Sequence, residues 1–342
     1  MNIGAYDLFV SCFLYLVSFS SMPRIPETIV GHEEQHVALL SDIASNNVSH
    51  AYLFHGPKHL GKMTMALWFA RELLRVGKDP EQCALIEHEI ERLTHPDLFV
   101  LDQLWMEGVC EDWNMIAKSS NVSQGHRKKD GAKTDVISIE DIRELHRLLH
   151  EKGLSRYRCC IIRSAERMQP SAGNALLKIL EEPPAGLVFI LTAASQSTIL
   201  PTIVSRSRTL SFHRVPEPKL LSMIPDADKD DQQFILSLAQ GAPGVVHSLS
   251  DDPDALRAHR LLKGKAVAFW QARALSDRLQ HLAPLLERGE EADQLLLHLS
   301  LTLRENTSRS PASSHALLEL LQGLKTNAHR QIMVQRFAVE VG

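Results

Sequence analysis

The sequence predicts an α/β protein: a parallel sheet covered by helices, followed by a small helical lid and a helical C-terminal domain. Short apolar runs alternate with helical segments up to about residue 214, an order typical of a parallel sheet buried on both faces. Beyond that point no segment has a strong strand pattern, and leucine-rich helical faces follow. We therefore predict a spurious or disordered extension (1–21), an α/β domain (22–214), a helical lid (215–253) and a helical collar or oligomerisation domain (254–342).

The elements of the α/β domain follow from their apolar patterns. Strands are predicted at 51–54, 95–102, 158–162 and 187–192, and helices at 33–45 and 64–74. Ser138 begins a further helix, because its side chain can cap a first turn that carries Glu140 and Asp141. In the lid we expect short helices at 232–239 and 245–249, and in the last domain helices at 293–304 and 315–324. The leucine-rich faces of that domain serve either oligomerisation or a self-contained bundle.

The polar stretch 107–134 is predicted to be an exposed insertion, because it offers no period that could pack. Its basic cluster, Arg127 to Lys133, is interpreted as a solvated loop, since no aromatic residues interleave with it as in single-strand binders. The net charge of −4 likewise gives no general sign of a nucleic-acid binder.

Composition indicates a cytoplasmic protein. The five cysteines lack CxxC spacing and are expected to be reduced thiols. The apolar run 8–19 is shorter than the ~20 residues that span a bilayer, and no basic residue precedes it, as a secretory signal requires. We expect Met22 to be the working start; a targeting or anchoring segment is the alternative.

A phosphate-binding loop is indicated by Gly56-Pro-Lys-His-Leu-Gly-Lys62, which has the GxxxxGK pattern between a predicted strand and a predicted helix. Its glycines, Gly56 and Gly61, let backbone N–H groups face phosphate oxygens, and Lys62 reaches the outer phosphates. Met63 stands where a serine or threonine would hold magnesium, and Thr64 follows one residue later. ATP or ADP in a degenerate site is the prediction; a simple glycine turn is the alternative.

The acidic residues of an active ATPase are missing from the expected place. A carboxylate at the end of a neighbouring strand normally holds the metal. Here the strand 158–162 runs into Arg163 and Ser164, and a guanidinium repels a cation. Glu166 comes two residues later, where we expect it to start the next segment. No independent ATP hydrolysis is expected.

Several uncommon strings occur in one order: the glycine loop, Ile161-Ile162, Ala165-Glu-Arg-Met168, Asn174-Ala-Leu-Leu-Lys-Ile-Leu-Glu-Glu-Pro-Pro184 and Ser205-Arg206. Over residues 31–249 this order resembles bacterial AAA+ clamp-loader subunits, most of all the delta-prime subunits of the DNA polymerase III holoenzyme. Arg163-Ser164 replaces the Asp-Glu pair of gamma/tau-type motors, and Gly244 stands about where those motors carry a sensor arginine.

The resemblance implies a non-motor subunit that helps load the sliding clamp onto primed DNA. Its partners would be gamma/tau and delta subunits, the clamp and, through the assembled complex, primed DNA, with no membrane. Arg206 would be an arginine finger acting in trans on a neighbour's nucleotide; a solvated surface arginine is the alternative. Although the holoenzyme is a DNA-directed DNA polymerase, nothing in this chain resembles polymerase chemistry.

Many members of this family carry a four-cysteine zinc module. In this chain, the cysteine and histidine residues of the segment 78–95 are only Cys83, His88 and His95, so no zinc is predicted. Two rival functions remain: an ATP-hydrolysing AAA+ protein, either a gamma/tau-like motor or a remodeller, and a scaffold with an empty loop.

Overall fold

The computed structural model describes residues 29–101, 120–122, 136–149, 153–305, 311–324, 326 and 329–341. The predictions about residues 1–21 and Met22, and those about most of the 107–134 insertion with its basic cluster, lie outside these residues. The chain divides into two compact units, the first ending at Val246 and the second beginning at His247. The domain boundaries predicted at 214 and 253 stay predictions.

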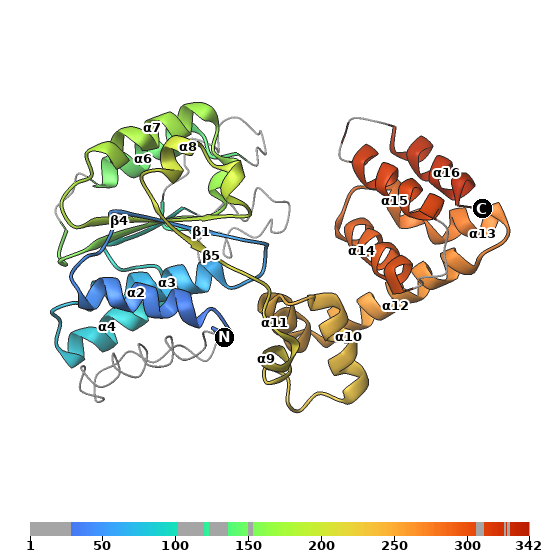
Figure 1. The fold of residues 1–342 in the computed structure, drawn as a ribbon, viewed down its shortest axis with the longest axis horizontal. Helices are drawn as coiled ribbons and strands as arrows, with labels where there is room; N and C mark the ends of the chain where they lie inside the picture. The colour runs from blue at the N-terminus through green and yellow to red at the C-terminus, as the bar shows by residue number, and fades with distance from the viewer. Residues whose placement is uncertain are drawn as a thin grey trace, which may run out of the picture. The chain divides into compact units, whose positions relative to one another are not determined.

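The first unit is built on a five-stranded parallel sheet with the order β2-β3-β4-β1-β5 (Figure 1). The strands are β1 (Ala51–His55), β2 (Leu98–Leu101), β3 (Arg158–Ile162), β4 (Leu187–Ala193) and β5 (Arg208–Ser211). The first four confirm the predicted strands, and their residues are almost all buried, as expected for strands covered on both faces. β5 was not predicted.

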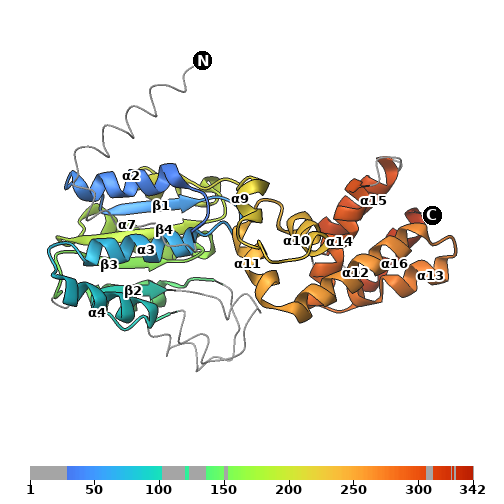
Figure 2. The same cartoon turned by 90° about the horizontal axis from the view of Figure 1, so that it is seen from below.

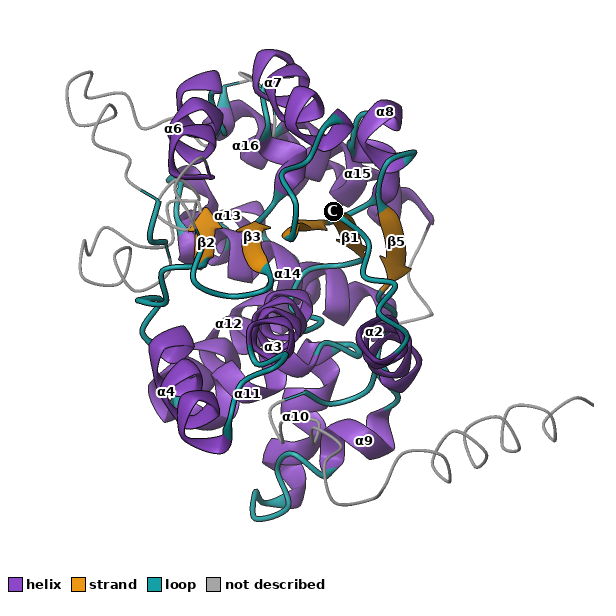
Figure 3. Ribbon diagram, turned by 90° about the vertical axis from the view of Figure 1, so that its left-hand side faces the viewer, coloured by secondary structure: helices purple, strands orange, loops and turns teal. Residues whose placement is uncertain are grey.

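Helices cover both faces of the sheet (Figure 3). One face carries α2 (Glu33–Ala44), α3 (Lys62–Leu74) and α4 (Pro80–Glu91), which lie side by side in Figure 2. The other carries α6 (Ile139–Leu149), α7 (Pro170–Glu181) and α8 (Pro201–Val204). Each layer has its own core, with Phe69 and Trp68 of α3 buried on the first face and Leu145 and Leu176 on the second.

Local signals set several helix starts. Ser138 caps α6 as predicted: its Oγ accepts the Asp141 N–H at 3.4 Å, and the Asp141 carboxylate accepts the Ser138 N–H at 2.7 Å. The helix α4 was not predicted, although Asp79 and Gln82 form a reciprocal capping box at its start.

Within the 107–134 stretch, Asn121 is exposed as expected, but the prediction is wrong for Val122, which is buried. Asn121 lies along the outer edge of β2, where its N–H donates to the Val100 carbonyl at 3.1 Å and its Oδ1 accepts the Val100 N–H at 2.7 Å. Val122 is buried in the core beneath α6. This stretch therefore pairs with backbone groups that an edge strand would otherwise leave open.

Short helices follow β5: α9 (Glu217–Leu221), α10 (Lys229–Ala239) and α11 (Pro243–Asp251). The second unit contains α12 (Pro253–Gln271), α13 (Leu275–His281), α14 (Glu290–Glu305), α15 (Pro311–Gly323) and α16 (Arg330–Glu340). Its helices bury a core of their own around Phe269, Leu295 and Phe337, as the bundle interpretation requires. Among the described residues, no helix is both long and apolar enough to cross a membrane.

Candidate functional site

The glycine loop joins β1 to α3, in the strand–loop–helix context that the sequence predicted. Gly56 has φ 148°, and a Cβ there would lie 2.2 Å from the Phe212 carbonyl oxygen, so only glycine fits. Gly61, with φ 82°, is the N-cap of α3 in the left-handed region. The loop thus delivers the chain to the start of α3, where helix N–H groups and the helix dipole favour a phosphate.

A cavity of about 380 Å³ opens at this end of the sheet. Its lining comes from the glycine loop and the start of α3, from the segment that follows β3, from the end of β4 and the residue after it, and from the start of α11. The lining residues are Lys58, His59, Leu60, Gly61, Lys62, Met63, Thr64, Arg163, Ser164, Glu166, Thr192, Ala193, Ala194 and Gly244. Parallel strands end at one edge of a sheet, and this is why residues far apart in sequence meet here.

Lys62 points back to the loop, where its Nζ donates to the carbonyl oxygens of Gly56 at 2.6 Å and Pro57 at 2.5 Å. Burial lowers the pKa of Lys62 to about 8, helped by the positive charges of Arg163 and Lys58 and opposed by the carboxylate of Glu166. All the nucleotide-binding residues predicted from the sequence therefore meet at one place: Gly61, Lys62 and Thr64 line the cavity, and Gly56 supplies a carbonyl to Lys62.

The end of β3 presents a cation and a hydroxyl to the cavity, Arg163 and Ser164. The Ser164 N–H donates to Thr192 Oγ1 at 3.1 Å, which ties this turn to the end of β4.

Glu166 was not expected in the site. It was expected to start the next segment; it lies in the middle of a 3-10 turn (Ala165–Arg167), and this turn places Glu166 in the lining of the cavity. Its Oε1 accepts the Ala194 N–H at 3.3 Å, and its Oε2 is buried with no hydrogen-bond partner among the described residues. Ala165, the first residue of this turn, is buried in the core.

This donor set fits a phosphate group better than a divalent cation. A phosphate would meet the start of α3 and the ammonium of Lys62. A metal would find one carboxylate, Glu166, close to the charges of Lys62 and Arg163, with Met63 in place of a hydroxyl ligand.

Residues 78–95, where other family members carry the zinc module, are mostly helical. Cys83 and His88 lie in α4, and His95 precedes β2 with its Nδ1 accepting the Asp97 N–H at 3.1 Å. Within the described ranges there is no group of three or more His, Cys, Asp or Glu residues suited to a metal ion. The absence of zinc stays a prediction.

Gly244 closes the cavity from the α11 side. Its N–H donates to the His59 carbonyl in the glycine loop at 2.9 Å. A Cβ at Gly244 would lie 3.0 Å from that carbonyl oxygen, a tighter contact than most Cβ atoms make.

Arg206 lies away from this cavity, in the turn after α8. Its Nη2 is 3.0 Å from the Oε1 of Glu181, its Nη1 donates to the Thr202 carbonyl at 3.1 Å, and the side chain is 37% exposed. Arg206 is not among the residues that line the cavity of its own chain.

The sheet order, the glycine loop and the helical layers define a P-loop protein of the AAA+ class. The family model described as "DNA polymerase III, delta subunit" matches residues 31–216, and the chain belongs to this family.

Curated relatives include both kinds of clamp-loader subunit. The gamma/tau subunit of Mycobacterium tuberculosis is 30% identical over 198 residues, which cover 57% of this chain and 30% of the relative. The tau subunit of Bacillus subtilis is 27% identical over 301 residues (80% and 48%), and its delta' subunit 30% over 186 residues (54% and 47%). The chain therefore spans less than half the length of each of these relatives.

A solved structure of a DNA polymerase III gamma subunit-related protein from Thermotoga maritima has the same fold. It superposes with a TM-score of 0.52 at 18% identity, covering 89% of this chain and 98% of that protein.

Proposed function

We propose that this chain is a delta-prime-like, non-motor subunit of the DNA polymerase III clamp loader. It helps to load the sliding clamp onto primed DNA and supplies Arg206 in trans to a neighbouring ATPase subunit of the gamma/tau type. The observation that carries the proposal is the end of β3, where Arg163 and Ser164 face the phosphate cavity in place of metal-binding acids.

Two further features support this proposal. Gly244 occupies the α11 position at the cavity and offers no side chain to a phosphate. Arg206 is partly exposed outside that cavity, and a planar guanidinium is suited to stabilise charge on a transferred phosphoryl group. The proposed partners are gamma/tau and delta subunits, the sliding clamp and primed DNA.

A motor of the gamma/tau type, or another AAA+ remodeller, is the second candidate. It is favoured by Glu166, a carboxylate in the same cavity as Lys62, and by the similarity to gamma/tau subunits. In such a protein Glu166 would have to hold the metal. ATP and ADP remain the proposed ligands of the cavity in either case.

Steady-state ATPase assays separate the two. We expect negligible turnover by the isolated chain and normal turnover by a complex reconstituted with gamma/tau and delta partners and the clamp. Arg206→Ala should lower turnover by the complex by at least about tenfold, since arginine fingers contribute on the order of 10³ or more. Turnover by the isolated chain that is lost in Lys62→Ala would establish the motor instead. Normal turnover by the Arg206→Ala complex would refute the trans role.

A further inference from the structure

The turn that carries Arg206 is fixed by its neighbours. The hydroxyl groups of Ser205 and Ser207 donate to the carbonyls of Thr202 at 3.1 Å and Ile203 at 2.8 Å, within α8. The Arg206 N–H donates to the Ile203 carbonyl at 3.2 Å. The backbone at the arginine is therefore held against α8, and the direction of the guanidinium is left to contacts of the side chain.

Those contacts come from Thr202 and Glu181. The guanidinium gives one N–H to the Thr202 carbonyl and faces the Glu181 carboxylate at 3.0 Å. Arginine has five N–H donors, so three lie outside these two contacts. The guanidinium can thus keep both contacts and still present donors to a phosphate, which makes Glu181 a support for the arginine.

The Glu181 side chain is 53% exposed, but its backbone belongs to a helix that packs on the core. Glu181 is the last residue of α7, whose Leu176 and Leu180 are buried in the core. Gly173 of α7 touches Leu200, just before α8, so closely that a Cβ at Gly173 would lie 2.7 Å from the Leu200 Cδ1. This close approach packs the start of α7 against the segment that leads into α8.

We propose that Glu181 is a positioning residue for Arg206: it holds the guanidinium in the direction from which it reaches a neighbouring subunit's nucleotide. This inference rests on the proposed trans role of Arg206. It assigns a task to the first glutamate of the Leu-Glu-Glu-Pro-Pro string at 180–184. Glu181 acts only through the arginine and does not touch the nucleotide.

The test uses the full reconstituted complex with Glu181→Gln, Arg206→Ala and the double variant, and with Glu182→Gln as the matched control. The Glu182 carboxylate makes none of the described contacts of Arg206. We expect Glu181→Gln to lower kcat for ATP about two- to fivefold, the range of a partly exposed ion pair. The KM for ATP, the assembly of the complex seen by gel filtration, and the Glu182→Gln control should stay at wild-type values.

The double variant decides whether Glu181 works through Arg206. Its kcat should equal that of Arg206→Ala alone, because a positioning residue has no effect once its target is gone. An additive loss in the double variant, or an unchanged kcat in Glu181→Gln, would overturn the proposal. A raised kcat in Glu181→Gln would also overturn it, because Glu181 would then restrain Arg206 in an inactive direction. If Arg206→Ala itself leaves kcat unchanged, the trans role fails first, and this inference fails with it.

Discussion

The N–H of Gly244 donates a 2.9 Å hydrogen bond to the carbonyl oxygen of His59, and this bond joins the start of α11 to the glycine loop. The His59 carbonyl thereby satisfies one of the N–H groups that a helix N-terminus leaves open. His59 adopts a left-handed backbone conformation with φ 62°, which an L residue rarely does without such support.

Gly244→Ala should weaken this contact. The added Cβ would lie 3.0 Å from the His59 carbonyl oxygen, and displacing a packed backbone costs about 1–3 kcal/mol. Gly264→Ala is the matched control, because a Cβ there meets nothing within 4 Å in α12 and alanine gains about 0.5–1 kcal/mol in a helix. We expect faster amide hydrogen exchange at residues 242, 244–246 and 58–61 in Gly244→Ala only. Unchanged protection there, with a raised thermal midpoint, would show that the close approach does not constrain the loop.

The pKa of Lys62 leads to a second prediction. Because burial lowers it to about 8, the amine should lose its proton and react with an acylating reagent with a midpoint near pH 8. Reactivity should rise with pH, since only the neutral amine is nucleophilic. Modification of the peptide that contains Lys62, followed by mass spectrometry, measures the midpoint.

Two variants that should shift the pKa of Lys62 in opposite directions serve as controls for this measurement. The Glu166 carboxylate raises the pKa of Lys62, so Glu166→Gln should move the midpoint to lower pH. Arg163 lowers the pKa, so Arg163→Gln should move it to higher pH. Shifts in the same direction in both variants would mean that a rearranged loop, and not charge, sets the reactivity of Lys62.

The parts of the fold that could be predicted are mainly those whose conformation is set by residues within the same segment. β1 and β4 are buried on both faces, so their apolar runs are visible without knowledge of their neighbours. Gly61 is dictated by the left-handed backbone of the loop itself. The GxxxxGK spacing also locates Gly56, although the carbonyl of the distant Phe212 is what excludes a Cβ there. The residues of the glycine loop could therefore be predicted individually from the sequence.

The parts that were missed depend on partners distant in sequence. β5 is a four-residue edge strand, incompletely buried, that forms by pairing with β1, and its Arg-Thr-Leu-Ser sequence has no apolar pattern. Asn121 takes the place of a strand neighbour at β2 with its backbone N–H and its side-chain amide, for which sequence patterns give no signal. Glu166 reaches the cavity through a turn whose direction the spacing alone does not define.

Asn121 provides a third prediction. Its side chain accepts the Val100 N–H at 2.7 Å and donates to the carbonyls of Leu98 at 2.6 Å and Leu93 at 3.1 Å. Asn121→Ala should lower the free energy of unfolding by about 1–3 kcal/mol, because these backbone groups at the edge of β2 lose their partner. Ser120→Ala is the control: it removes a single hydrogen bond to the Val100 carbonyl and should cost about 0.5–1.5 kcal/mol. Urea unfolding measures both. Equal losses would mean that the amide of Asn121 does not protect the edge.

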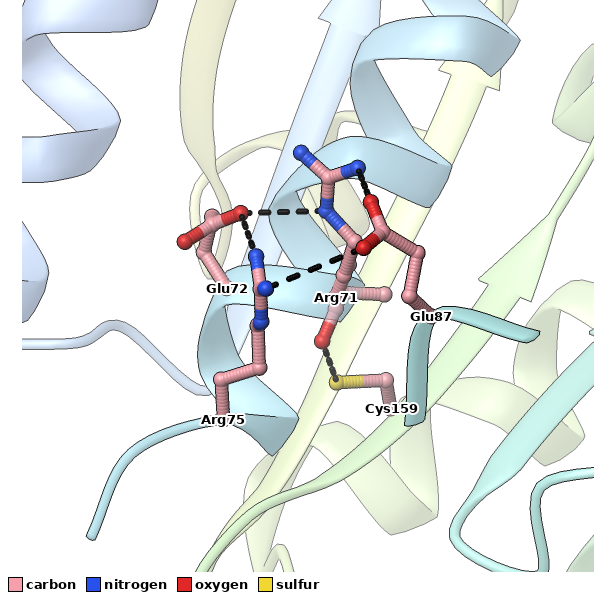
Figure 4. Close-up of polar contacts among 6 residues, drawn as sticks. Arg71, Glu72, Arg75, Glu87 and Cys159 are labelled. Atoms are coloured by element: carbon pink, nitrogen blue, oxygen red, sulfur yellow. Dashed lines mark hydrogen bonds and ion pairs between the residues drawn. The ribbon is translucent and has the colours of Figure 1, made fainter. Parts of the chain in front are cut away.

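The contact between α3 and α4 contains four charged side chains (Figure 4). Glu72, 8% exposed, is 3.1 Å from the Nε of Arg71 and 3.4 Å from the Nη1 of Arg75. Glu87, 45% exposed, is 2.9 Å from the Nη1 of Arg71 and 3.9 Å from the Nη2 of Arg75. The two glutamates thus share the same two arginines but differ in burial.

This difference predicts unequal costs for the same substitution. Glu72→Gln removes the buried counter-charge of two partly buried arginines and should lower the free energy of unfolding by about 1–3 kcal/mol. Glu87→Gln removes an exposed partner and should cost at most about 1 kcal/mol. Raising the salt concentration to about 1 M should abolish the smaller cost, because ions screen exposed pairs, and leave most of the larger one. Urea unfolding of both variants at low and high salt tests this; equal costs, or a Glu72→Gln cost that salt removes, would show that burial does not set the strength of this network.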